Sequence, residues 1–296
     1  MSTKHPIIAV TGSSGAGTTT VMKSFAHIFR REGFKAQVIE GDSFHRFDRV
    51  EMRGRVKAAD EGKGPQISHF GPESNLLAEL AATFGEYAET GSGKVRRYIH
   101  DDAEAAELGG KPGTFTPWAP MSTDSDLLFY EGLHGAYVGE DDGVDVGRHV
   151  DLLVGVVPII NLEWIQKLHR DKNLRGYSQE AVVETILRRM PDYVHHICPQ
   201  FSKTHVNFQR VPVVDTSNPF IAKDIPSADE SMVVIRFANP KGIDFPYLLS
   251  MLDDSWMSRP NNIVVPGGKM GLAMQLIFTP MILRLMDLRK RALRNG

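Results

Sequence analysis

Short apolar runs alternate along this chain with longer segments whose apolar residues recur at three- and four-residue steps. The short runs predict buried strands at 7–10, 38–39, 127–130, 152–157, 211–214 and 232–237. The longer segments predict helices at about 17–31, 72–90, 160–172, 178–190 and 272–294. Strands that alternate with helices indicate an α/β fold with a mainly parallel sheet and right-handed crossovers.

Two polar, glycine-punctuated stretches interrupt the alternation, near 43–72 and 91–125. They predict insertions, the first of them a long loop with one short helix. Neither an internal repeat nor a linker composition divides the chain. We therefore expect residues 1–296 to form a single domain.

The turn after the first predicted strand has the composition of a phosphate-binding loop. It fits G-x-x-x-x-G-K-[ST] at every defined position except the lysine, where Thr18 stands. Its glycines allow several backbone N–H groups to face one anion, and the following helix adds its positive end. The predicted ATP-binding residues are Gly12, Ser13, Ser14, Gly15, Ala16, Gly17, Thr18, Thr19 and Thr20. The alternative is an ordinary glycine-rich turn, and a cation for the phosphates must come from elsewhere.

A second cluster of candidate residues follows the second predicted strand. Asp42 stands just past its carboxyl end, where ligands of open α/β sheets bind, and could accept a proton from a substrate hydroxyl. Five cationic or titratable residues follow within a dozen positions and suit a phosphorylated substrate: His45, Arg46, Arg49, Arg53 and Arg55. The alternative is a solvated loop in which Asp42 caps a helix.

Two further segments carry carboxylates and cations. The apolar run at 127–130 ends in Glu131, a layout that suits a ligand of Mg²⁺. Lys167, Arg170 and Asp171 are spaced by three and four residues, so they share one face of the predicted helix. That face could equally carry surface ion pairs.

Beyond these local patterns, the chain resembles the phosphoribulokinases of bacterial type, within the phosphoribulokinase/uridine kinase family. Segments along nearly the whole chain carry the resemblance: 12–19, 40–42, 44–47, Tyr98, 100–104, 129–135, 161–167, 207–220 and 255–259. The resemblance implies a P-loop kinase fold, similar to the nucleoside-monophosphate kinases, with a mainly parallel sheet flanked by helices. Threonine in place of the loop lysine is similar to what bacterial members show.

The resemblance also implies roles for individual residues. Asp42 would be the catalytic base and Asp171 a second catalytic acid, with Lys167 and Arg170 on phosphoryl oxygens. The residues for the sugar phosphate would be His45, Arg49, Arg53, Tyr98, His100 and Arg175. Mg²⁺ would be held by Thr19, Glu131 and Asp42. ATP and ribulose 5-phosphate would be the substrates, and ribulose 1,5-bisphosphate the product, as in carbon fixation by the Calvin cycle. Two alternatives stay open, a related uridine- or pantothenate-type kinase and an inactive nucleotide sensor.

Composition narrows the remaining possibilities. The chain has 34 Lys and Arg against 36 Asp and Glu, a net charge of −2, which excludes a global basic field for nucleic acid or membrane. Its only cysteine, Cys198, excludes an internal disulfide. The apolar stretch from Leu152 to Leu162 is too short for a membrane span, and no signal-peptide core is present, so we expect a cytoplasmic protein.

Without an internal disulfide, regulation has to be non-covalent. The resemblance implies activation by NADH, inhibition by AMP and a homo-oligomer, an octamer in similar proteins. Arg236 at the end of a predicted strand is the leading candidate effector residue, because a guanidinium can bind a dinucleotide phosphate. Arg188 and Arg189 are further candidates, although the helix dipole alone favours cations in the last turn of a helix.

Overall fold

The computed structural model describes residues 4–13, 18–139 and 143–294, without the side chains at 18, 19, 174 and 175. In this part of the chain eight strands form one sheet in the order β2-β5-β1-β6-β7-β8-β10-β9. Their bounds are β1 Ile7–Thr11, β2 Ala36–Glu40, β5 Leu127–Gly132, β6 Leu152–Val157, β7 Val206–Pro212, β8 Ser231–Phe237, β9 Trp256–Arg259 and β10 Asn262–Pro266. The strands from β2 to β7 in this order are parallel, and the last three are antiparallel. The predicted mainly parallel α/β fold is confirmed.

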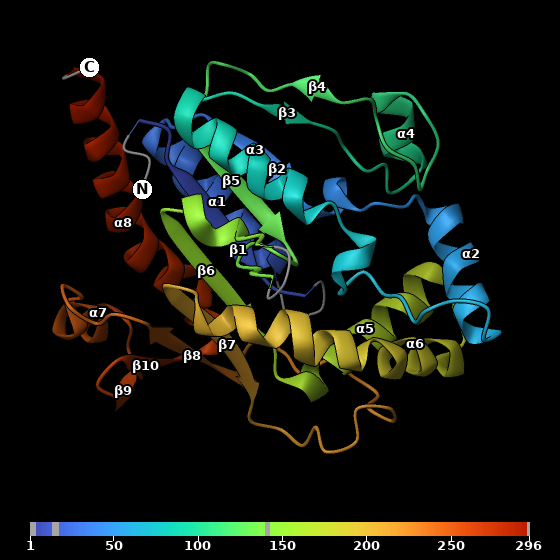
Figure 1. Ribbon diagram of the computed structural model, residues 1–296. Coiled ribbons are helices and arrows are strands. Elements are labelled where there is room, and N and C mark those ends of the chain that lie inside the picture. The colour runs from blue at the N-terminus through green and yellow to red at the C-terminus, as the bar shows by residue number, and fades with distance from the viewer. Residues whose placement is uncertain (1–3, 14–17, 140–142, 295–296) are drawn as a thin grey trace.

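Helices lie on both faces of the sheet and beyond the ends of its parallel strands (Figure 1). Their bounds are α1 Thr18–Glu32, α2 Arg49–Asp60, α3 Leu77–Thr90, α4 Asp102–Leu108, α5 Ile160–Arg175, α6 Gln179–Asp192, α7 Phe245–Met251 and α8 Met270–Arg294. A separate two-stranded antiparallel sheet of β3, Lys94–Val95, and β4, Ala119–Pro120, lies in the second predicted insertion. Figure 1 shows α2, α5 and α6 at the end of the molecule toward which the arrow of β5 points.

Each face of the sheet has its own apolar core. On one face α1 and α8 pack together, and the Phe25 ring lies 5.1 Å from Phe129 and 4.8 Å from Phe278. On the other face α3 packs, with the Phe84 ring 5.4 Å from Tyr130. Phe129 and Tyr130 are neighbours in β5, and side chains of successive strand residues point to opposite faces. Burial on both faces explains why the parallel strands read as continuous apolar runs.

Two boundary predictions were wrong, whereas the helix predicted in the first insertion is present. The strand predicted at 211–214 is β7, which begins at Val206. Its start was missed because Asn207 is polar. The Asn207 amide is buried and hydrogen-bonds to the Thr204 hydroxyl and to the Phe201 carbonyl. The helix predicted from residue 72 begins at Leu77, because Leu76 donates its backbone N–H to the Phe44 carbonyl instead. The first insertion holds the twelve-residue helix α2, which Asp48 caps by accepting the Glu51 N–H at 2.8 Å.

The C-terminal third also differs from expectation, since α7, β9 and β10 were not predicted. There the segment Gly267–Arg294, which contains α8, is long and apolar enough to cross a membrane by length and composition. One side of α8 nevertheless lies in the core beside α1, through Ala273, Ile277 and Phe278 among others. Packing against the sheet therefore accounts for the apolar residues on that side.

Candidate active site

The phosphate-binding loop begins where β1 ends. The Gly12 N–H donates to the Gly132 carbonyl at 3.1 Å, which ties the start of the loop to the end of β5. Residues 14–17 lie outside the described residues, as do the side chains of Thr18 and Thr19, and Thr20 is exposed in the first turn of α1. A buried strand before the loop and a helix after it are the context that the motif requires.

Glu163 is a contact of this loop that the sequence did not predict. The Ser13 hydroxyl donates a hydrogen bond to its carboxylate, and both side chains are buried. Burial raises the pKa of Glu163, although the Ser13 hydrogen bond and the charges of Lys167 and Arg170 act in the opposite direction. Glu163 lies one turn before Lys167 on α5, and that spacing was the available signal. The carboxylate thus joins the loop to the cations of α5.

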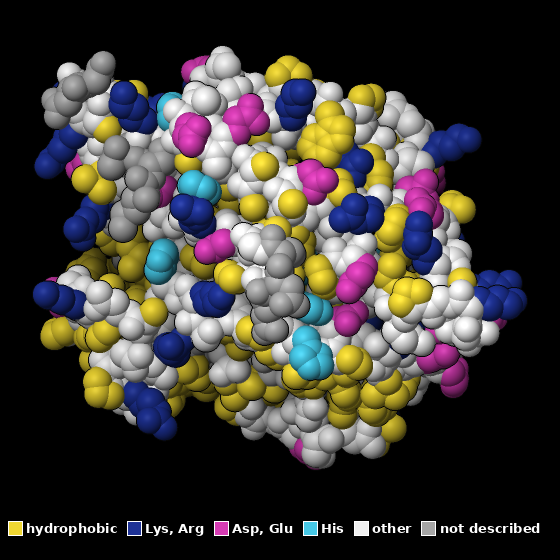
Figure 2. Space-filling view, in the orientation of Figure 1, with side chains coloured by type: hydrophobic (Ala, Val, Ile, Leu, Met, Phe, Trp, Pro, Cys, Tyr) yellow, Lys and Arg dark blue, Asp and Glu magenta, His cyan; other side chains and the backbone are white. Residues whose placement is uncertain are grey.

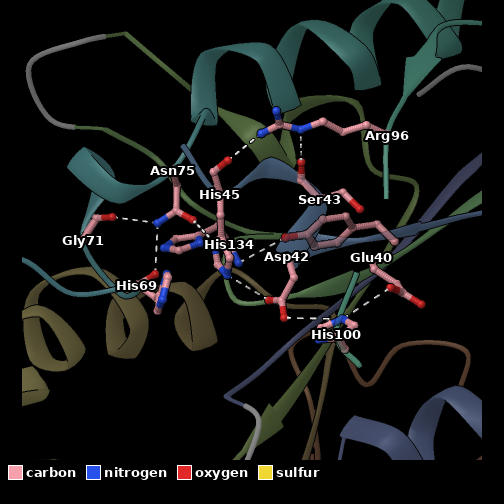
Figure 3. Close-up of polar contacts among 11 residues, drawn as sticks. Glu40, Asp42, Ser43, His45, His69, Gly71, Asn75, Arg96, His100 and His134 are labelled. Carbon is pink, nitrogen blue, oxygen red and sulfur yellow. Dashed lines mark hydrogen bonds and ion pairs between the residues drawn. The ribbon is translucent and has the colours of Figure 1, made fainter. Parts of the chain in front are cut away.

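Asp42 lies in a short 3-10 turn, Gly41–Phe44, directly after β2. One of its oxygens is 3.1 Å from His45 Nε2 and the other 3.9 Å from His100 Nε2 (Figure 3). Burial acts to raise the pKa of Asp42, but the hydrogen bond and charge of His45, with the charges of His100 and His69, outweigh it and lower the pKa. The side chain is still 44% exposed, so an ionised carboxylate is open to a ligand.

His45 is held on its far side by Asn75. The Asn75 amide nitrogen donates to the carbonyls of Gly71 at 2.7 Å and His69 at 3.0 Å. Its oxygen therefore faces His45 Nδ1 at 2.9 Å, and the His69 ring lies tilted against the His45 ring with the centroids 4.2 Å apart. Neither Asn75 nor His69 was predicted as a site residue, because their role depends on the tertiary fold, which places residues 69–76 beside the turn at 41–45.

Three predicted substrate residues surround this turn. The Tyr98 ring packs edge-on against His100, with the centroids 4.9 Å apart. Arg49 donates to the His100 carbonyl at 2.8 Å, and its guanidinium lies 5.9 Å from the Tyr98 centroid. The structure thus brings α2 and the second insertion together beside Asp42. Glu40 also lies here, with its Oε2 atom 4.0 Å from His100 Nε2. It was not predicted as a site residue, although it ends β2, the strand that Asp42 follows.

Of the remaining two substrate candidates, Arg53 and Arg175, only Arg53 has a described side chain. Arg53, one turn after Arg49 on α2, donates to the Tyr177 hydroxyl at 3.2 Å. Tyr177 follows α5 and stands two residues after Arg175, whose side chain lies outside the described residues. Arg53 therefore connects α2 with the segment between α5 and α6.

Lys167, Arg170 and Asp171 form a cluster on α5 in which Asp171 is buried and the two cations are partly buried. Asp171 accepts hydrogen bonds from Lys167 and, at 3.0 Å, from Arg170 Nε. The side chains of Lys167 and Asp171 are only 15% and 5% exposed, which excludes a solvated surface pair. Burial, followed by the charge of Arg189, lowers the pKa of Lys167 to about 8 despite the opposing effect of Asp171. For Asp171, burial acts to raise the pKa, but the Lys167 hydrogen bond and both cations lower it overall.

The predicted effector arginines lie in different places. Arg188 pairs with Asp60 of α2 at 3.2 Å. Arg189 lies 5.7 Å from the Phe70 centroid, and its charge lowers the pKa of both Lys167 and His69, so it lies between the α5 cluster and the Asp42 turn. Arg236 lies on β8, three strands away from β1, and its guanidinium has no hydrogen-bond or ion-pair partner among the described residues.

Comparison with known proteins agrees with this geometry. The sequence model described as the Phosphoribulokinase / Uridine kinase family matches residues 7–217. The chain belongs to this family. It is 67% identical over 292 residues to the chromosomal phosphoribulokinase of Cupriavidus necator, with 99% of each chain covered. It is 63% identical to the phosphoribulokinase of Nitrobacter vulgaris, with 98% of this chain and 99% of the relative covered.

A solved structure extends the similarity to three dimensions. The phosphoribulokinase from Rhodobacter spheroides superimposes with a TM-score of 0.89 at 58% identity, over 98% of this chain and 100% of the other. The predicted membership of the phosphoribulokinase/uridine kinase family and the predicted P-loop kinase fold are both confirmed. The match covers the antiparallel strands and α8 as well as the parallel sheet.

A magnesium site in a kinase of this family needs few protein ligands. Glu131 is paired in register with Val10 of β1 and Glu40 of β2, at the end of β5 beside the start of the loop. No cluster of three or more His, Cys, Asp or Glu suited to a metal occurs among residues 4–13, 18–139 and 143–294. Mg²⁺ usually keeps several waters and binds one or two carboxylates plus substrate phosphates, so a single strand-end carboxylate fits it.

Proposed function

We propose that this protein transfers the γ-phosphoryl group of ATP to the 1-hydroxyl of D-ribulose 5-phosphate, forming ribulose 1,5-bisphosphate for the Calvin cycle. Near-full-length relatives with the name phosphoribulokinase support this function. The observation that carries it is the position of Asp42, ionised and open to a ligand, between His45 and His100. A base surrounded by residues that bind phosphate suits a sugar phosphate that bears a free hydroxyl.

Asp42 accepts the proton of the attacking hydroxyl. His45, Arg49, Tyr98 and His100 hold the substrate around it, while Arg53 and Arg175 reach the sugar phosphate from α2 and from the end of α5. A guanidinium pairs with phosphate oxygens through two parallel hydrogen bonds, which fixes orientation as well as charge. In phosphoryl transfer such positioning, with electrostatic stabilisation, supplies almost all of the catalysis.

ATP binds at residues 12–20, with its phosphates against the backbone N–H groups of the loop and the start of α1. Lys167 and Arg170 supply the cations that Thr18 does not, and Asp171 orients both of them through its hydrogen bonds. Thr19, Glu131 and Asp42 would hold Mg²⁺, which when bound neutralises charge on the phosphate oxygens. The contact from Ser13 to Glu163 supports this assignment, because it links the loop to the same helix.

A coupled ADP-release assay tests the function directly. The expected result is rapid ADP release with ribulose 5-phosphate and none with uridine or pantothenate. Uridine-dependent release would favour a uridine-type kinase, whose neutral substrate gives the cations around Asp42 no phosphate to bind. Absence of turnover with tight ATP binding would indicate a nucleotide sensor, a role that the presence of Asp42, Glu131 and Asp171 argues against.

The proposal extends to regulation, oligomeric state and cellular location. NADH and AMP act as effectors, Arg236 is the leading effector residue, and Arg188 and Arg189 are secondary ones. Among the described residues the Arg236 guanidinium has no hydrogen-bond or ion-pair partner, which supports this role because a guanidinium can pair with phosphate. The chain forms a homo-oligomer in the cytoplasm and binds neither nucleic acid nor membrane. On the face seen in Figure 2, basic and acidic side chains are interspersed, which argues against a continuous basic surface on that face.

A further inference from the structure

Arg96 reaches from the second insertion to the turn that carries Asp42. It follows β3, and its guanidinium donates to two backbone carbonyls of that region (Figure 3). The distances are 2.8 Å from Nε to the Ser43 oxygen and 2.6 Å from NH2 to the His45 oxygen. Arg96 does not contact the Asp42 carboxylate, so any influence on catalysis passes through the backbone.

The two carbonyls have no other described hydrogen-bond donor, whereas their neighbours do. Residues 44–46 pair with 74–76, since Leu76 donates its N–H to the Phe44 carbonyl and Arg46 donates its N–H to the Ser74 carbonyl, each at 2.8 Å. Ser43 and His45 are 1% and 6% exposed, so water is a poor substitute for the guanidinium. The turn is thus held by residues 74–76 on one side and by Arg96 on the other.

The guanidinium itself is fixed by two aromatic rings. Its central carbon lies 3.7 Å from the Phe115 centroid and 4.9 Å from the Trp118 centroid. Phe115 and Trp118 lie just before β4 in the same insertion. The insertion therefore supplies both Arg96 and the aromatic rings that hold it. Lysine could not reproduce this arrangement, because an ammonium is a point charge without a planar pair of donors.

We propose that Arg96 is a positioning residue that sets the geometry of the Asp42–His45 turn for proton transfer. The inference rests on the proposed role of Asp42 and deepens it: the second insertion, through Arg96, aligns the base with the hydroxyl. Without the guanidinium, the Ser43 and His45 carbonyls turn to find other donors and carry the Asp42 side chain with them. A displacement of about 1 Å at a reacting group can lower the rate by about 10²-fold.

The test compares Arg96→Ala and Arg96→Lys with Arg97→Ala. Arg97 is the next residue, and its side chain is exposed, so it controls for substitution in this segment of the insertion. We expect Arg96→Ala to lower kcat by about 10²-fold, with KM for ATP nearly unchanged and the protein still folded at the assay temperature. The kcat of Arg96→Lys should be at least about tenfold below that of wild type, because lysine keeps the charge but not the paired donors. Arg97→Ala should behave as wild type.

Chemical rescue separates positioning from mere stabilisation of the fold. Guanidinium at a non-denaturing millimolar concentration should raise kcat of Arg96→Ala and leave wild type unaffected. Asp42→Asn, measured in parallel, should be impaired and not rescued; normal turnover there would overturn the role of Asp42 rather than that of Arg96. If Arg96→Ala does not fold, the kcat of Arg96→Lys alone tests the proposal. Near-normal kcat in a folded Arg96 variant, or a loss that extends equally to ATP binding and is not rescued, would overturn the proposal.

Discussion

The Nε2 atom of His45 lies 3.1 Å from one carboxylate oxygen of Asp42, and only two residues separate them in the chain. The contact is possible because the turn after β2 brings residue 45 back beside residue 42. It also accounts for the lowered pKa of Asp42, since the hydrogen bond and charge of His45 favour the carboxylate and outweigh its burial. A carboxylate that stays ionised at neutral pH is ready to accept a proton.

Substitution of Asp42 by asparagine should remove the base while preserving the shape of the turn. We expect kcat to fall by about 10²–10⁴-fold, the usual contribution of a general base. ATP affinity, measured by equilibrium binding, should change little, because the phosphate-binding loop is untouched. Asp102→Asn, at an exposed position of α4, is the control. Near-normal turnover of Asp42→Asn would reassign the base, with Asp171 as the next candidate.

Lys167→Met tests the source of the cation that Thr18 does not provide. We expect kcat/KM to fall far more than loss of an exposed ion pair allows, which would be about 0–1 kcal/mol. The matched control is Lys172→Met, because Lys172 lies on the same helix but is exposed and bonds to Gln179. Equal effects of the two substitutions on kcat/KM for both substrates would show that Lys167 has no special role.

The lowered pKa of Lys167 predicts an alkaline limit to activity. An ammonium is charged below its pKa, so a function that needs the charge is intact at low pH and lost as the pH rises through about 8. The profile of kcat/KM against pH should therefore fall above about 8. Lys167→Arg, which keeps its charge to much higher pH, should move this limb upward. If kcat/KM of Lys167→Arg falls at the same pH as that of wild type, the fall is due to the titration of another group.

Arg236→Ala tests the effector proposal independently of catalysis. We expect NADH stimulation to be lost while turnover of the fully active enzyme stays roughly intact, since β8 lies three strands from β1. Allosteric coupling is typically about 1–3 kcal/mol, so the lost stimulation should be about 5–150-fold. The control is Arg148→Ala, at an exposed arginine outside β8, which should retain the response. A wild-type enzyme insensitive to NADH, or a variant that responds fully, would contradict this assignment without affecting the kinase reaction.

Local patterns in the sequence were enough to predict four of the parallel strands (β1, β2, β5 and β6), the loop between β1 and α1, and Asp42 beyond β2. Each of these depends on residues close together in the chain: β-branched runs, glycine spacing, and the rule that ligands meet the carboxyl ends of parallel strands. The same reasoning placed Lys167, Arg170 and Asp171 on one helical face, because the helical repeat alone determines it. It could not tell a buried cluster from surface ion pairs.

Only the tertiary structure decided which distant residues support those near the reaction. Asn75 reaches His45 from 30 positions away, Arg96 reaches Ser43 from 53, and Glu163 reaches Ser13 from 150. Such contacts depend on how the insertions fold back over the sheet, and asparagine, arginine and glutamate each have many other uses on a protein surface. The sequence by itself determined the elements and the chemical groups at their ends. Burial and the return path of the chain determined their partners, because hydrogen bonds across a fold have no period that a sequence can display.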